Sequence, residues 1–132
     1  MRMMKEIATR RSIRKYKAEP VSDDVIRQLL ESACLAPSGS NTQPWHFIVV
    51  RDPQIKAQLA AASHQQQWML AATELALGTC WVAWFTQAAI RPILNIPEDK
   101  YVVGILTLGY AAEEPAARPR KNIEDVLHYD LW

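Results

Sequence analysis

Apolar positions recur at helical spacing in two well-marked segments of the chain. Ser22 is a suitable N-cap, and the apolar stripe that follows it until Pro37 consists of Val25, Ile26, Leu29, Leu30, Ala33 and Cys34. Asp52-Pro53 suits the start of a second helix, with Ile55, Leu59 and Ala62 on one face. Short helices are expected over residues 3–9 and 86–94. Residues 70–77 are apolar on nearly every side except at Glu74, which predicts a buried helix ended by Gly78.

Three further segments favour strands. His46 to Val50 predicts a buried strand, Thr79 to Phe85 a second, and the near-continuous apolar run Tyr101 to Tyr110 a central strand. After Glu113-Glu114-Pro115 the chain becomes polar and is expected to form a tail. Helices and strands therefore alternate along a single domain of residues 1–132, a pattern typical of α/β or α+β folds.

The composition indicates more apolar surface than so small a domain usually carries. Hydrophobic residues make up 49% of the 132 residues, and five residues are tryptophans. A domain of this size buries only about two-thirds of the surface of its unfolded chain. The tryptophans therefore either fill the core or pack against another subunit or a flat aromatic ligand.

Charge and cysteine content limit the compartment and the partners. The net charge of +1 provides no global field to attract nucleic acid or an anionic membrane, which disfavours a nucleic-acid-binding module built on the basic residues 10–17. No apolar stretch reaches the roughly 18 residues of a membrane span, and no signal peptide is apparent. Cys34 and Cys80 are too few for a disulfide framework, and Cys80 is expected to be a buried small hydrophobic residue. A reduced, cytoplasmic protein is expected.

Several common chemistries lack their motifs. With four glycines, the sequence contains neither a G-x-G-x-x-G nor a P-loop pattern, so a phosphate cradled by glycine-rich backbone is disfavoured. The three histidines lack metal-ligand spacing, and Ser38 is not in a nucleophile elbow. An anionic ligand would therefore be held by side chains.

Two arginine segments could hold such an anion. If residues 10–14 are extended, Arg10, Ser12 and Arg14 point to one side, and if they are helical, Arg10 and Arg14 still share a face. Two guanidinium groups and a hydroxyl suit a phosphate dianion. Near the other end, Arg118 and Arg120 repeat the alternation around Pro119. Each segment, taken alone, could equally be a solvated basic surface.

Residues 37–45 form a loop that is rich in hydrogen-bonding groups. Two prolines bracket small and amide residues between a predicted helix and a predicted strand. Gly39 allows close approach of the backbone, and Asn41 and Gln43 offer both donors and acceptors to the edge of a flat heteroaromatic ring. Such loops are commonly plain turns, but this one has more hydrogen-bonding capacity than a turn requires.

Taken together, these motifs resemble the nitroreductase family of flavoproteins. The resemblance rests on Arg-Arg-Ser-Ile-Arg-x-Tyr at 10–16, Ala-Pro-Ser-Gly-Ser-Asn-x-Gln-Pro-Trp at 36–45, Glu-Leu-Ala-Leu-Gly-Thr-Cys-Trp at 74–81, and Arg-Pro-Arg-Lys at 118–121 with Val126 and His128. It implies an α+β three-layer sandwich with a central mixed sheet flanked by helices, and FMN at a homodimer interface. It also implies a ping-pong reaction in which NADH or NADPH reduces FMN and a nitroaromatic, quinone or similar small acceptor reoxidises it.

The resemblance also implies the residues of the cofactor site. Arg10, Arg11, Ser12 and Arg14 would hold the phosphate from the front of the chain, and Arg118 and Arg120 would close on it from the tail. The loop residues that would line the isoalloxazine ring, partly from the partner subunit, are Pro37, Ser38, Gly39, Ser40, Asn41 and Gln43. Gly78 and Thr79 would lie against the ring with their backbone. No catalytic side chain is expected, because the flavin itself carries the chemistry.

One departure from the family pattern lies near residues 68–70. Family members carry an additional strand and the beginning of a helix where this chain runs from Gln65-Gln66-Gln67-Trp68-Met69 almost directly into the apolar segment 70–77. Either the chain is a compact variant, or a segment is missing there. A non-catalytic or degenerate FMN-binding member of the family is therefore the alternative function. Glu74 is either solvent-facing or a buried acid paired with a base.

Overall fold

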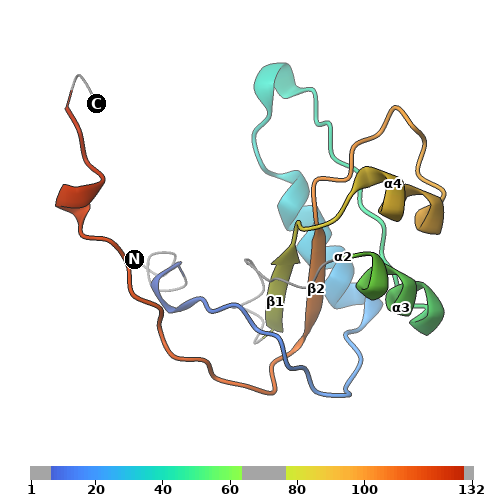
Figure 1. Ribbon diagram of the computed structural model, residues 1–132, viewed down its shortest axis with the longest axis horizontal. Coiled ribbons are helices and arrows are strands. Elements are labelled where there is room, and N and C mark those ends of the chain that lie inside the picture. Colours follow the sequence, from blue (N-terminus) through green and yellow to red (C-terminus); the bar gives the residue numbers. More distant parts are fainter. Residues whose placement is uncertain (1–6, 64–76, 130–132) are drawn as a thin grey trace.

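A computed structural model describes residues 7–63 and 77–129 of the chain (Figure 1). Its elements are α2 (Asp23–Cys34), η1 (Gly39–Asn41), α3 (Pro53–Ala62), β1 (Leu77–Val82), α4 (Gln87–Ile90), η3 (Arg91–Leu94), β2 (Ile105–Tyr110) and η4 (Ile123–Asp125). Residues 7–9 are also helical, as expected for the short opening helix. Helices and an antiparallel strand pair in one chain confirm the α+β class.

The sheet combines one strand pair with a segment from the N-terminus. β1 and β2 are antiparallel, with Leu77 opposite Tyr110 and Val82 opposite Ile105. Residues 10–17, which we call the N-terminal arm, join this pair through a parallel bridge from Ser12 to Thr79 and an antiparallel bridge from Tyr16 to Ala111. Pairing in both directions agrees with the mixed sheet that the sequence predicted.

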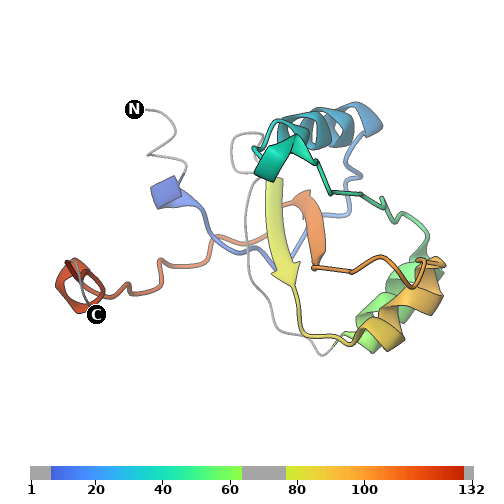
Figure 2. The ribbon, with the colours of Figure 1, turned by 90° about the horizontal axis from the view of Figure 1, so that it is seen from above.

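The two predicted helices begin where their capping residues place them. The Ser22 side chain accepts a hydrogen bond from the backbone N–H of Val25, and Asp52 accepts from those of Gln54 and Ile55. Figure 2 shows α2 on one side of the sheet, with α3 and α4 together at one end. The core between α2 and the sheet consists of Val21 and Leu77, with Val25, Ile26, Leu29, Leu108 and Tyr110 packed around them. Leu59 of α3 is buried, as expected from its place on the predicted apolar face of that helix.

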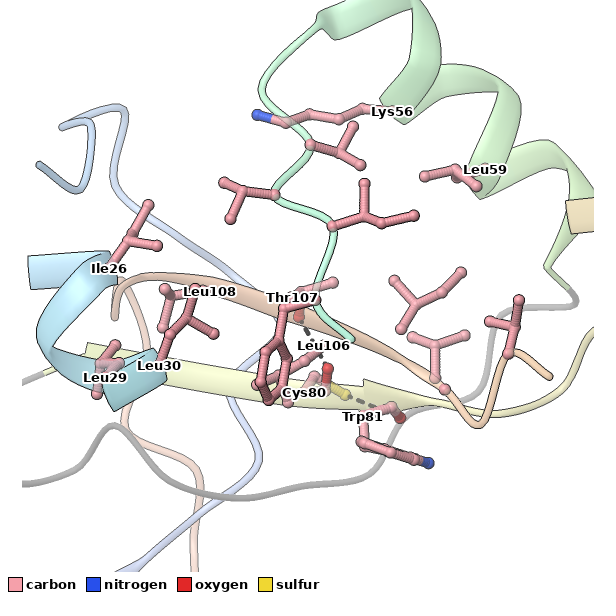
Figure 3. A pocket seen from close by; sticks show the side chains of 18 of the residues that line it. Ile26, Leu29, Leu30, Lys56, Leu59, Cys80, Trp81, Leu106, Thr107 and Leu108 are labelled. Carbon is pink, nitrogen blue, oxygen red and sulfur yellow. Dashed lines mark hydrogen bonds between the residues drawn. The ribbon is translucent and has the colours of Figure 1, made fainter. Parts of the chain in front are cut away.

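The buried strand predicted over 46–50 is wrong. These residues are extended but form no strand, and Phe47, Ile48 and Val49 are 48%, 56% and 50% exposed. A strand needs a neighbouring edge at hydrogen-bonding distance. Figure 3 shows instead that this segment lies above the sheet. It faces β2 across a pocket that side chains of both segments line. The apolar side chains of residues 46–50 therefore line that pocket and are not part of the sheet.

Two further boundaries differ from prediction. Leu77 and Gly78 belong to β1, so Gly78 does not end a helix, and its backbone does not adopt the left-handed conformation of a helix C-cap. β1 ends at Val82 rather than Phe85, and β2 begins at Ile105 rather than Tyr101. The predicted helix over 70–76 and Glu74 lie outside the described residues. Within the described ranges, no helix is long and apolar enough to cross a membrane.

Candidate functional site

The N-terminal arm is fastened to the sheet along its whole length. The Ile13 N–H donates to the Thr79 carbonyl oxygen at 2.9 Å, which places the arm beside β1. Further along, the Lys17 N–H donates to Tyr110 O and the Ala112 N–H donates to Lys15 O, both at 2.9 Å. The arm therefore starts beside β1 and ends beside the residues that follow β2. This places its arginines next to the sheet.

Two glycines that face each other across the strand pair make room for the arm. Gly78 and Gly109 are direct partners in the β1–β2 register. A Cβ atom at Gly78 would lie 2.6 Å from the Ile13 side chain, and one at Gly109 would lie 2.8 Å from the Tyr16 ring. Neither approach is possible for a residue with a side chain. The glycines therefore allow Ile13, which is 8% exposed, to be buried.

Tyr16 ties the arm to both strands through its hydroxyl group. The hydroxyl donates to the Ile13 carbonyl oxygen at 2.6 Å and lies 2.6 Å from Thr107 Oγ1. Thr107 in turn donates to the Cys80 carbonyl oxygen at 3.2 Å, the bond drawn in Figure 3. Burial raises the pKa of the Tyr16 phenol above its ordinary value of 10.0. Cys80 is 2% exposed, which confirms it as a buried small residue.

The arginines of the arm differ in their hydrogen bonding. Nη1 of Arg11 donates to the carbonyl oxygens of Ala8 and Arg10, so this guanidinium turns back onto its own segment. Arg10 Nη1 and Arg14 Nε are buried, and neither has a hydrogen-bond partner among the described residues. Buried donors are almost always satisfied in native proteins, so these two nitrogens are the donors of the arm that remain for a further acceptor.

Arg10 and Arg14 line a broad groove of about 2790 Å³. One of its walls is α2 and the segment 44–51, and the other is β2 with the segment 99–104 that precedes it. Figure 3 shows apolar side chains of α2 and β2 directed into this space, with Lys56 and Leu59 above them on α3. The lining of the groove thus combines two arginines with many apolar side chains, which suits a ligand that has both an apolar ring system and an anionic group.

The loop 37–43 lies apart from the arm in this single chain. Figure 1 shows η1 beyond the far end of α2, well away from the N-terminal arm. The loop holds its own shape, because the Gln43 N–H donates to the Ser38 hydroxyl at 3.0 Å. Ser40, Asn41 and Gln43 have φ values of 52°, 55° and 45°, which are unfavourable for side-chain-bearing residues. A Cβ at Gly39 would meet nothing within 4 Å, so any close approach there would come from another molecule.

The C-terminal arginines lie on the segment that follows the sheet. Arg118 and Arg120 are exposed, on a tail that leaves the sheet and extends away from the body of the molecule in both ribbon views (Figures 1 and 2). The structure therefore brings Arg10, Ser12 and Arg14 together with Gly78 and Thr79, places the loop 37–43 apart from them, and leaves Arg118 and Arg120 exposed on the tail. Their convergence on one cofactor stays a prediction.

Sequence reasoning missed one residue of this region. Glu113 was taken only as the start of a polar tail, but its carboxylate accepts hydrogen bonds from the backbone N–H groups of Arg14 and Lys15. The local sequence offers no signal for this contact, because the partners are 99 and 98 residues apart along the chain. Only the strand register places them together.

Comparison with known proteins agrees with this arrangement. The sequence model of the Nitroreductase family matches residues 7–68 and 65–110, which is most of the chain. The chain belongs to the nitroreductase family. A protein of Archaeoglobus fulgidus named for NADH dehydrogenase or NAD(P)H nitroreductase activity is 31% identical over 171 aligned positions, covering 98% of each chain.

Solved structures share the fold of this chain. A Desulfovibrio desulfuricans nitroreductase-like protein, determined in complex with FMN, is 26% identical and superposes with a TM-score of 0.81, covering 97% of this chain and 96% of that one. A protein of Parabacteroides distasonis, 20% identical, gives a TM-score of 0.86 over 100% and 99% of the two chains. These likenesses confirm the nitroreductase fold expected from the sequence motifs.

The comparisons also bear on the middle of this chain. The family match falls into two blocks that meet at residues 65–68. The alignment with the Archaeoglobus protein spans 171 positions, whereas this chain has 132 residues. Some residues of that relative therefore have no counterpart here.

Proposed function

We propose that this nitroreductase is an FMN-dependent oxidoreductase that uses NADH or NADPH to reduce a nitroaromatic, quinone or similar small acceptor. The single observation that carries the proposal is the pair of buried, unsatisfied guanidinium nitrogens of Arg10 and Arg14 in the lining of a largely apolar groove. A related nitroreductase-like structure was determined with FMN, and a relative is named for NAD(P)H nitroreductase activity. Both support the assignment of cofactor and reductant.

The residues present fit the phosphate of FMN. Arg10 and Arg14 would donate to it, each with a nitrogen that is otherwise unpaired, and the Ser12 hydroxyl lies between them in the sequence. Leaving a buried charged donor unpaired costs about 1–3 kcal/mol or more, so binding a dianion here removes a penalty that the free protein carries. Arg118 and Arg120 would close on the phosphate from the tail.

The reaction would need few side chains of the protein. When bound, FMN would supply the redox chemistry, accepting hydride from the nicotinamide and passing electrons to the acceptor in a ping-pong cycle. The backbone of Gly78 and Thr79 and the loop 37–43 would position the ring. No group of three or more His, Cys, Asp or Glu residues that could hold a metal occurs in the described ranges.

We propose further that the protein acts as a homodimer, with loop 37–43 completing the partner's site. Phe47, Ile48 and Val49 are 48%, 56% and 50% exposed in the single chain, and contiguous exposed apolar side chains commonly mark a surface that a partner covers. The separation of the loop from the arm within one chain also supports a contribution from a second subunit.

The test of the cofactor site is FMN binding by arginine variants. Purified protein is expected to be yellow, with about one FMN per subunit, and to sediment as a dimer. Arg10→Ala combined with Arg14→Ala should abolish FMN retention, while the matched control Arg27→Ala, an exposed arginine on α2, should retain it. Unchanged FMN affinity in the double variant would refute the phosphate assignment.

A second candidate function is FMN binding without turnover. The two-block family match and the 171-position alignment favour it, because we place the residues without counterpart at the join near 65–70. Anaerobic addition of NADH or NADPH to the flavin-loaded protein separates the two functions. Bleaching of the flavin absorbance is expected for the oxidoreductase; a flavin that stays oxidised with both reductants would leave only the binding function.

The expected location is the reducing cytoplasm. Cys34 and Cys80 are both free thiols, which suits that compartment.

A further inference from the structure

Glu113 joins the two ends of the chain at the candidate phosphate site. Its carboxylate oxygen Oε1 accepts the backbone N–H of Arg14 at 2.5 Å and that of Lys15 at 3.1 Å. The same residue begins the tail that carries Arg118 and Arg120, only five and seven positions later. One side chain therefore links the arm with the origin of the tail.

We propose that Glu113 is a positioning residue that sets the Arg14 guanidinium for an anionic ligand. The inference rests on the proposed function, because the ligand it refers to is the phosphate of FMN. The backbone bonds on either side of Arg14 are already assigned: the Ile13 N–H reaches Thr79 and the Lys15 carbonyl accepts from Ala112. The Arg14 N–H has the Glu113 carboxylate as its partner, so this contact fixes the peptide from which the guanidinium extends.

The carboxylate acts in two opposing ways on a bound phosphate. As a negative charge near the arm, it repels the phosphate. As an acceptor of two backbone donors, it fixes the arm, and bonds to a charged acceptor are about twice as strong as neutral ones. Holding a binding group in place before the ligand arrives reduces the ordering cost of binding. Because Glu113 bonds to the backbone rather than to a guanidinium, it leaves the Arg14 side chain available, and we expect positioning to outweigh repulsion.

The effect should depend on the phosphate of the ligand. FMN and riboflavin share the isoalloxazine ring and differ in the phosphate group, so the ratio of their dissociation constants isolates what the arm contributes. A purely structural role of Glu113 would weaken the binding of both flavins alike. A positioning role would weaken that of FMN and leave riboflavin unchanged.

The experiment measures FMN and riboflavin binding by flavin fluorescence for wild type, Glu113→Ala, Glu113→Gln and Glu114→Ala. Glu114 is the matched control, because it is the adjacent carboxylate and is exposed. Glu113→Ala should weaken FMN binding about tenfold or more, with riboflavin binding within about twofold of wild type. Glu113→Gln, which keeps a neutral acceptor, should fall between Glu113→Ala and wild type. Glu114→Ala should bind both flavins as wild type does.

Equal loss of FMN and riboflavin affinity in Glu113→Ala, or no loss of either, would overturn the inference. If Glu113→Ala does not fold, Glu113→Gln decides alone, and an unchanged ratio of the two dissociation constants overturns it. A wild-type chain that binds neither flavin would instead refute the proposed function, and this inference with it. The two failures are therefore distinguishable.

Discussion

Substitution of Gly78 by alanine tests how the N-terminal arm is held on the sheet. The added Cβ would lie 2.6 Å from Cβ and Cγ2 of Ile13 and 2.7 Å from its Cγ1. Carbon atoms in good contact are about 3.5–4.0 Å apart, so the arm would have to move by about 1 Å. These atoms are close to the arm's own backbone, so a rotamer change cannot relieve the contact. The displacement would also stretch the Ile13 N–H bond to Thr79, which is now 2.9 Å.

The size of the effect follows from three contributions. Overpacking a filled site costs about 1–3 kcal/mol. Weakening one backbone hydrogen bond costs about 0.5–1.5 kcal/mol. Replacing glycine by alanine restricts the unfolded chain and offsets these costs by about 0.4–1 kcal/mol. We therefore expect Gly78→Ala to lower the free energy of unfolding by about 1–3 kcal/mol, which lowers Tm by about 3–15 °C in a domain of this size.

Urea and thermal unfolding of the apoprotein, together with FMN affinity, provide the assay. Gly39→Ala is the matched control for stability alone, because the Cβ added there would meet nothing within 4 Å of this chain and Gly39 has no positive φ. Its stability should stay within about 0.5 kcal/mol of wild type. Gly78→Ala should also bind FMN more weakly, because the displaced arm carries Arg10 and Arg14. Equal stability of the two variants would refute the packing of the arm described above.

Three further perturbations test the capping, titration and burial found in the structure. Burial raises the pKa of Tyr16 above 10.0, so the contribution of its neutral phenol to folding stability should be fully present below about pH 10 and should be lost as the pH rises further. Tyr16→Phe should therefore flatten the alkaline decline in stability. The control Tyr101→Phe, at an exposed tyrosine, should leave the decline as in wild type. Asp52→Ala should lower the free energy of unfolding by about 1 kcal/mol in urea titrations, with Asp52→Asn near wild type, and equal loss in both would contradict the capping role. In the native protein a thiol reagent should modify Cys34 rapidly and Cys80 only on unfolding; rapid reaction of both would contradict the burial of Cys80.

Features governed by nearby residues could be predicted from the sequence. The helices that begin after Ser22 and Asp52 were located correctly, because a capping side chain bonds to backbone groups only two or three residues away. The family motifs at 10–16, 36–45 and 74–81 could likewise be recognised as short strings in order, and the family match covers all three, whereas the motif at 118–121 lies beyond it. The apolar character of residues 46–50 was also apparent, yet periodicity could not tell whether those side chains join a sheet or line a groove.

The tertiary structure decided how distant segments meet. Gly78 could be taken for a helix end from its neighbours alone, but it lies in β1 opposite Gly109, where Ile13 and Tyr16 cross the sheet. Glu113 acquired its role through hydrogen bonds to residues almost a hundred positions away. The arginines that hold the candidate site were evident from the sequence, whereas the surfaces that orient them were not. The reason is physical: local hydrogen bonds depend on residues that are always adjacent, while strand register and close glycine contacts exist only once the chain has closed on itself.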